Sequence, residues 1–253
     1  MPLDISRIRA LRTHTEIYYF QSVASTMTEA ARLLAGGASH GTLIIAEEQT
    51  AGMGRLGRSW ISEPETGVYT SILLHLPLSP ANLPIASLVL GLATAEAIHK
   101  ATHVACDLRW PNDVLVNERK VAGILTHLVD GCVIAGIGIN VNQTSFSPGL
   151  RTPATSLRIE SNGVMQSREA VVVALIESID GFCSGLAING PEAILRAFIS
   201  SSSYAMNRRV VLEEGGKKGM TVGLDENGFL LVHLDTGRTE RIATGGIRPD
   251  RSA

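Results

Sequence analysis

Residues Glu48 to Trp60 read EQTAGMGRLGRSW, a loop dense in glycine and arginine. Its distinctive residues are Gly52, Gly54, Arg55, Gly57 and Arg58. Glycines let backbone N–H groups come close to an anion, and guanidinium groups bind phosphate oxygens in pairs. The stretch therefore predicts a loop that can hold the phosphates of a nucleotide.

The elements on either side of this loop decide the fold class. Gly52 to Gly57 match G-x-G-x-x-G, but a dinucleotide-binding loop must lead from a strand into a helix. A strand is expected at Thr42 to Glu47, whereas Arg58 to Gly67 has no helical period and leads to a second strand at Val68 to Leu76. The loop joins two strands, which disfavours the Rossmann interpretation. A kinase-like loop is excluded because V-A-I-K and H-R-D motifs are missing. A surface hairpin without a ligand is the remaining alternative.

The rest of the first two hundred residues predicts helices alternating with strands. Thr26 and Glu29 have the spacing of a capping box, and Gly36-Gly37 should end the helix that they begin. We expect helices at 27–34, 83–100, 167–186 and 191–199, and strands at 16–21, 42–47, 68–76, 114–116, 121–128 and 133–139. This pattern predicts an α+β catalytic domain with a mixed sheet packed with helices.

The pattern changes near Ser200. Short strands are expected at 209–212, 220–224, 229–234 and 240–243, with glycine-containing turns between them. Four short strands with tight turns indicate a small β-barrel. We therefore expect one domain at residues 1–203 and a second at 204–253.

Composition limits the function classes. The chain has 253 residues, 45% hydrophobic, with a formal net charge of -2, so nucleic-acid binding is not expected. We see no secretory signal, and the longest apolar stretch, Ile85 to Ile98, is short for a membrane span. Three separated cysteines fit neither a zinc site nor a disulfide framework. The expectation is a cytoplasmic protein with no membrane contact and no metal held by protein ligands.

A second constellation runs from Arg109 to Thr126 and reads RWPNDVLVNERKVAGILT. Lys120 begins an apolar strand, where a lysine is often only a guard on a sheet edge. Glycines inside this strand and the next, at Gly123, Gly136 and Gly138, mark close approach by another backbone or by a ligand. Strands thinned in this way could give a flat floor for a small molecule, or only tight sheet packing.

Taken together, these segments resemble the catalytic module of a bacterial biotin protein ligase, also called biotin–[acetyl-CoA-carboxylase] ligase. Ser25-Thr26, the Glu48 to Trp60 loop, the Arg109 to Leu125 segment and Gly136 to Asn142 (GIGINVN) follow the family's order and spacing. The resemblance covers about residues 16–145 and is weaker in the C-terminal part, where it implies an SH3-like barrel. It implies ATP-dependent formation of biotinyl-5′-adenylate and transfer of biotin to a carrier lysine.

The resemblance also implies residue roles. Lys120, Arg55 and Asp113 would be catalytic. The expected biotin-binding residues are Ser25, Thr26, Met27, Gln49, Met53, Gly54, Arg55, Lys120, Gly123, Gly136 and Gly138. The expected ATP-binding residues are Gly52, Gly54, Arg55, Arg58, Asn112, Lys120 and Asn140. Asp113 could accept a bond from the incoming lysine or help to hold Mg²⁺, which should bind mainly through ATP phosphates. Trp60 could pack against the closed loop or be a core residue.

The family resemblance suggests partners as well. The protein partner would be the biotin carboxyl carrier domain of a biotin-dependent carboxylase, and a homodimer through the catalytic sheet is compatible with the family. Arg208-Arg209 and Lys217-Lys218 could meet an acidic carrier or form a solvated basic face.

Two departures from the family separate this chain from its relatives. Met53 stands where the family usually has arginine, which should weaken retention of the adenylate. The catalytic pattern begins near Glu16, which predicts a monofunctional ligase without a DNA-binding domain. The alternatives are a lipoate- or octanoate-protein ligase and a non-catalytic biotin- or adenylate-binding protein.

Overall fold

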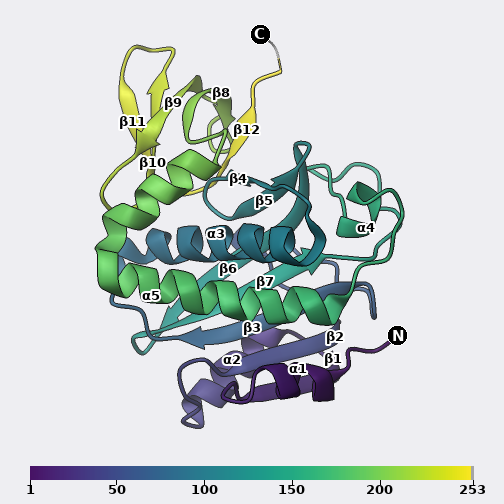
Figure 1. Ribbon diagram of the computed structural model, residues 1–253. Helices are drawn as coiled ribbons and strands as arrows, with labels where there is room; N and C mark the ends of the chain where they lie inside the picture. Colours follow the sequence, from purple (N-terminus) through teal and green to yellow (C-terminus); the bar gives the residue numbers. More distant parts are fainter. Residues whose placement is uncertain (252–253) are drawn as a thin grey trace.

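The computed structural model, described for residues 1–251, contains two sheets (Figure 1). The larger sheet has seven strands in the order β1-β2-β3-β7-β6-β5-β4, in which only β1 and β2 pair in parallel. Its strands are β1 Ile17–Val23, β2 Leu43–Gln49, β3 Gly67–Leu74, β4 Asp107–Arg109, β5 Asp113–Val116, β6 Arg119–Val129 and β7 Cys132–Asn140. The mixed sheet agrees with the α+β fold expected from the sequence.

Helices cover the two faces of this sheet unequally. The helices are α1 Ile5–Leu11, α2 Thr26–Ala35, α3 Leu83–Thr102, α4 Leu157–Glu160 and α5 Arg168–Ser201. Figure 1 shows α3 and α5 lying side by side over one face, where the main core forms. A smaller apolar cluster lies on the opposite face, where α2 packs on β2, β3 and β7.

Successive residues of β7 face opposite sides of the sheet, so the strand contributes to both faces. Ala135, Ile137 and Ile139 belong to the main core under α3 and α5. The residues between them, Gly136 and Gly138, point to the other face because successive side chains on a strand alternate. The sheet is therefore well packed on its helix face and thin on its α2 face.

Residues 206–249 contain the second, antiparallel sheet, in the order β11-β10-β9-β8-β12. Its strands are β8 Met206–Leu212, β9 Lys218–Leu224, β10 Leu230–Leu234, β11 Thr239–Ile242 and β12 Ile247–Pro249. Four of the five were expected, and β12 was missed. Trp110 Nε1 donates a hydrogen bond of 3.0 Å to Gly228 O, which ties this sheet to the first one.

Several local expectations need correction. The helix α2 begins with Ser25 as its N-cap, whose Oγ accepts from Met27 N, so the predicted Thr26–Glu29 capping box is wrong. Glu29 pairs with Arg32 instead. The two helices expected after Ser167 form one element broken at Gly190, where φ is +72°.

The expectation that the central apolar segment is too short to span a membrane also needs revision. Within residues 1–251, Pro80–Thr102 and Arg168–Ser201 are long and apolar enough by length and composition. In the first, 67% of the apolar window is buried in the protein, because α3 packs against both the sheet and α5. Its apolar composition is explained by its place in the core.

A buried ion pair anchors the N-terminal segment to the sheet. Arg168 Nη1 lies 2.8 Å from Glu47 Oε2, and the two side chains are only 4% and 2% exposed. Arg168 also donates to Gly67 O and Met1 O, while Glu47 accepts from Leu3 N. This network fixes the start of the chain against β2 and β3.

We predict that Arg168→Leu lowers the free energy of unfolding by about 3–5 kcal/mol, because it leaves the Glu47 carboxylate buried without its cation. Urea unfolding would measure the loss. The matched control is Arg196→Leu, which removes an exposed pair with Glu192 and should change stability by about 0.5 kcal/mol or less. Equal effects in the two variants would contradict the prediction.

Candidate active site

The glycine- and arginine-rich loop joins β2 to β3, as the sequence predicted; residues 50–66 are called the lid loop below. The loop folds back on itself, with Gly54 N donating to Arg58 O at 2.7 Å and Trp60 N donating to Gly52 O at 2.8 Å. A Cβ at Gly52 would lie 2.3 Å from Trp60 O. Gly52 lines neither cavity described below, so its role in this structure is to allow the close approach to Trp60.

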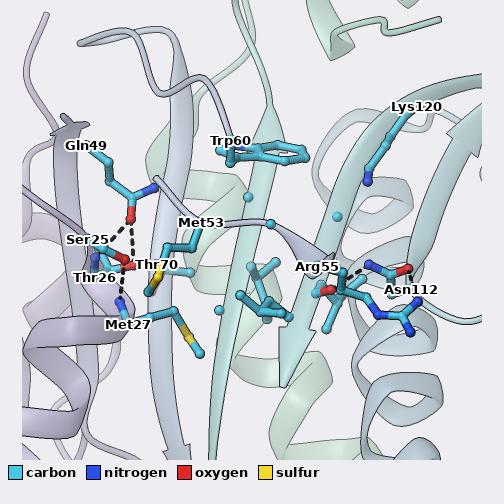
Figure 2. Close-up of a pocket in the computed structure, with 17 residues that line it drawn as sticks. Ser25, Thr26, Met27, Gln49, Met53, Arg55, Trp60, Thr70, Asn112 and Lys120 are labelled. Atoms are coloured by element: carbon cyan, nitrogen blue, oxygen red, sulfur yellow. Dashed lines mark hydrogen bonds between the residues drawn. The ribbon is translucent and has the colours of Figure 1, made fainter. Parts of the chain in front are cut away.

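Three glycines form a floor under the lid loop, and Gly123, Gly136 and Gly138 are called the glycine floor below. A Cβ at Gly138 would lie 2.4 Å from the Trp60 ring, and one at Gly136 would lie 2.8 Å from Met27 Sδ. Figure 2 shows the indole of Trp60 extended over this part of the sheet. A Cβ at Gly123 would lie 2.9 Å from both Lys120 Nζ and the Trp60 ring, so a side chain at any of the three positions would displace a residue above the floor.

A small cavity of about 50 Å³ remains between the glycine floor and the lid loop. All eleven residues expected to bind biotin line it, so the structure brings together segments that lie far apart in the sequence; their role in binding stays a prediction. Sequence reasoning missed the lining residues Thr70, Ile124, Leu125 and Ile137. These lie on buried strands, where their apolar or β-branched character gives no signal beyond packing.

Thr26 and Gln49 are joined by hydrogen bonds at one end of the small cavity, beside Ser25, whose Oγ accepts from Met27 N (Figure 2). Gln49 Oε1 accepts from Thr26 N at 2.9 Å and from Thr26 Oγ1 at 3.1 Å, and Gln49 Nε2 donates to Ser62 Oγ at 2.8 Å. The Gln49 amide therefore links the start of α2 to the lid loop.

Lys120 lines the same cavity and pairs with Asp113, which lines only the larger cavity described below. Lys120 Nζ lies 2.5 Å from Asp113 Oδ1, and Arg109 Nη2 lies 2.5 Å from Asp113 Oδ2. Lys120 Nζ also lies 5.4 Å from the centroid of the Trp60 ring, within the range of a cation–π contact. Lys120 is thereby held between an anion and an aromatic face.

Two opposing effects set the pKa of Asp113. Burial favours the neutral acid, but Lys120 and Arg109 outweigh it and lower the pKa to about 2. Both oxygens already face a cation. A bond from an incoming lysine or to Mg²⁺ would have to share these oxygens, and that role of Asp113 stays a prediction.

Arg55 links the lid loop to both sheets. Its Nη1 donates to Asn112 Oδ1 at 3.3 Å and to Gly245 O at 3.0 Å, the latter in the C-terminal sheet region. Burial is the main cause that lowers the pKa of Arg55, and Asp113 opposes it. Arg55 thus stands where the lid loop, the β4–β5 turn and the C-terminal segment meet.

A second cavity, of about 440 Å³, lies between the lid loop, the β4–β5 turn and the C-terminal sheet. This volume is within the range of about 300–1,000 Å³ usual for small-molecule sites. It is lined by six of the residues expected to bind ATP, namely Gly54, Arg55, Arg58, Asn112, Lys120 and Asn140. Five residues line both cavities: Gly54, Arg55, Trp60, Asn112 and Lys120.

Asn140 differs from expectation in its contacts. Its Nδ2 donates to Lys120 O at 3.4 Å and to Thr155 O at 3.0 Å, so the amide N–H groups fix the backbone around Lys120. We expected this residue to bind ATP. The structure shows its side chain bound to the protein itself.

Several residues that line the larger cavity could not be predicted from the sequence. Arg151 lies on the loop before α4, and Glu213, Gly245 and Gly246 belong to the C-terminal segment. None is adjacent to the four matching motifs, so only the folded chain shows that they meet. The basic residues Arg208 and Arg209, in contrast, pair with Glu118 and Asp235, as expected of a solvated face.

Comparison with known proteins identifies the class. Residues 19–143 match the family model described as "Biotin/lipoate A/B protein ligase family", and residues 206–247 match "Biotin protein ligase C terminal domain". The chain is 32% identical to Bifunctional ligase/repressor BirA of Bacillus subtilis (strain 168) over 232 residues, which covers 87% of this chain and 70% of that protein.

Other relatives support the same assignment. Biotin--[acetyl-CoA-carboxylase] ligase of Mycobacterium tuberculosis is 29% identical over 240 residues, 89% of this chain and 86% of that one. The solved biotin protein ligase from Aquifex aeolicus in complex with biotin and ATP superposes with a TM-score of 0.79 at 34% identity, covering 94% and 99% of the two chains. This chain belongs to the biotin protein ligase family.

The lowered pKa of Asp113 predicts how acid affects stability. A carboxyl with a lower pKa in the folded state stabilises the fold above its unfolded pKa of about 4 and loses this contribution as the pH falls through about 2. Between pH 4 and pH 2, wild type should lose on the order of 2 kcal/mol more unfolding free energy than Asp113→Asn. Urea unfolding at several pH values would measure this; parallel curves would contradict it.

Proposed function

We propose that this protein is an ATP-dependent biotin ligase, a biotin--[acetyl-CoA-carboxylase] ligase. It would join biotin to AMP and then pass biotin to a lysine of a biotin carboxyl carrier domain. The observation that carries this proposal is the junction of the two cavities. Gly54, Arg55, Trp60, Asn112 and Lys120 line both, so a ligand in the small cavity and a nucleotide in the large one would meet beside two cations.

In the first step, a biotin carboxylate oxygen attacks the α-phosphorus of ATP. A carboxyl–phosphate bond forms, the bond to the β-phosphate breaks, and pyrophosphate leaves. Two anions must approach each other, so Lys120 and Arg55 would lower the barrier by stabilising the charge between them. At about 4 Å and an effective dielectric constant of about 20, one such attraction is worth roughly 4 kcal/mol.

In the second step, the ε-amine of a carrier lysine attacks the carbonyl carbon of biotinyl-5′-adenylate. The new amide bond forms, AMP leaves, and the amine loses a proton. Neither step requires a nucleophile from the protein. Catalysis would come from the positioning and charge stabilisation that the lid loop and Lys120 provide.

Biotin would lie on the glycine floor. Ser25, Thr26 and Gln49 would hydrogen-bond to its ureido ring, and Met27 and Met53 would cover its apolar part. The 50 Å³ cavity is far below an ordinary ligand volume, so the indole of Trp60 must leave the floor before biotin can enter. The buried Trp60 Nε1 has no hydrogen-bond partner within residues 1–251, which makes this position of the indole costly to keep.

ATP would occupy the larger cavity, with Arg58 and Asn112 near its phosphates. Mg²⁺ would be carried by the ATP phosphates, because Asp113 faces Lys120 and Arg109 and Glu213 faces two arginines. These pairs leave few carboxylate oxygens for a dedicated metal site.

The remaining expectations belong to the same proposal. Residues 1–203 would be the catalytic domain, and residues 204–253 an SH3-like barrel, supported by the five antiparallel strands and their tight turns. The protein would act in the cytoplasm, and it could pair through the free edge of β1.

ATP-dependent labelling of a carrier domain tests the function. The full chain would be incubated with ATP, a carboxyl carrier domain and either biotin or lipoate, and the carrier mass measured. We expect the biotin increment alone. A lipoate increment would favour the lipoate-ligase alternative, and binding without any mass change would favour a non-catalytic biotin-binding protein.

We predict that Lys120→Ala slows pyrophosphate release by at least about 100-fold, the scale for loss of one preorganised charge contact. Stopped-flow pyrophosphate detection with biotin and ATP would measure it. Lys100→Ala is the matched control, because Lys100 pairs with Glu96 on α3 and lines neither cavity. A pyrophosphate burst of near-normal rate in Lys120→Ala would remove Lys120 from this role.

A substitution at Met53 tests the effect of adding a cation to the site rather than removing one. Met53→Arg should slow adenylate dissociation by about tenfold, because a charge-assisted hydrogen bond contributes about 1.5–3 kcal/mol. Release of labelled adenylate after filtration would give the rate. Met165→Arg, at an exposed methionine that lines neither cavity, controls for the added charge. No slowing in Met53→Arg relative to this control would count against the prediction.

A further inference from the structure

Glu213 is an anion in a cavity that should attract a polyphosphate. It follows β8 in the C-terminal sheet, and its side chain is only 9% exposed. It lines the larger cavity together with four cationic side chains, Arg55, Arg58, Lys120 and Arg151. By its charge alone, a carboxylate at this place would repel the phosphates of ATP.

The contacts of Glu213 show that it also holds two cationic side chains. Arg58 Nη2, from the lid loop, lies 3.1 Å from Glu213 Oε2. Arg151 Nε, from the loop before α4, lies 3.3 Å from Glu213 Oε1. Each guanidinium has five N–H donors in a rigid plane, so one bond to Glu213 orients the group and leaves other donors for a ligand.

The backbone around Glu213 is itself fixed. Glu213 N donates to Gly246 O at 2.9 Å, and a Cβ at Gly246 would lie 3.2 Å from Glu213 Oε2. The adjacent Gly245 O accepts from Arg55 Nη1. Glu213 and the paired backbone at Gly245–Gly246 therefore bind both arginines of the lid loop, and glycine at position 246 leaves room for the carboxylate.

We propose that Arg151 and Arg58 form a clamp for the pyrophosphate portion of ATP and that Glu213 is the positioning residue that orients both. The inference rests on the ligase function proposed above. Lys120 and Arg55 stand at the junction of the cavities, where the α-phosphate reacts. Arg58 and Arg151 line only the larger cavity, on the side of the C-terminal sheet, where the departing phosphates would lie.

The direction in which Glu213→Gln changes the KM for ATP distinguishes a positioning role from a purely electrostatic one. Glu213→Gln removes a negative charge from the cavity while keeping the side-chain size. If Glu213 only repelled ATP, this change would lower the KM for ATP. If it orients the two arginines, the change raises the KM, because both guanidinium groups lose their anchor.

The experiment measures the two half-reactions separately with the full chain. In ATP–pyrophosphate exchange, Arg151→Ala and Glu213→Gln should each raise the KM for ATP, by about tenfold for Arg151→Ala, the effect of losing about 1.4 kcal/mol. The KM for biotin should stay within about twofold. Transfer from preformed biotinyl-5′-adenylate to a carrier should be unchanged, since that compound has no pyrophosphate.

The matched control is Asp235→Asn, which removes a carboxylate paired with Arg209 in the same sheet but outside both cavities. It should leave every constant unchanged. A lower KM for ATP in Glu213→Gln, unchanged kinetics in Arg151→Ala, or equal damage to adenylate transfer would each overturn the proposal.

Calorimetric titration with inorganic pyrophosphate separates this inference from the proposed function. Wild type should bind pyrophosphate, and Arg151→Ala should bind it about tenfold more weakly. If wild type forms no adenylate but shows this difference, the ligase function fails and the clamp stands. If wild type forms adenylate but the affinities are equal, the clamp fails and the ligase function stands.

Discussion

The alternation of glycine with isoleucine along β7 is the constraint on which the site depends. Isoleucines on one face pack against α3 and α5, where burial of large apolar side chains stabilises the sheet. Glycines on the other face leave a floor without side chains, beneath Trp60 and Met27. Because the side-chain period of a strand is two, a shift of register by one residue would fill the cavity and empty the core together.

Charge is arranged around that floor so that each cation has a fixed partner. Lys120 faces Asp113, Arg55 bonds to Asn112 and Gly245 O, and Arg58 faces Glu213. A cation held by one anion is oriented without being fully neutralised by its surroundings. Such preorganisation reduces the reorganisation needed when a charged substrate arrives.

The sequence predicted the parts of the site that lie within continuous motifs. The lid loop between two strands, the glycine floor and Lys120 each belong to a stretch of local pattern. The sequence could not predict that Asn140 bonds to the Lys120 backbone or that Trp60 lies on the floor, because both follow from side-chain directions in the folded chain. Strands of three residues, β4 and β12, are too short to show a period.

The C-terminal sheet shows most clearly why local pattern is insufficient. Glu213 meets Arg58 across 155 positions of sequence, and Gly245 O meets Arg55 across 190. Trp110 Nε1, bonded to Gly228 O, holds the same sheet against the β4–β5 turn, which carries Asn112 and leads into Asp113. The sheet therefore contacts both the lid loop and the turn beside Lys120 and Asp113. A displacement of this sheet would move Glu213 and Gly245 together, so the C-terminal segment belongs to the site itself.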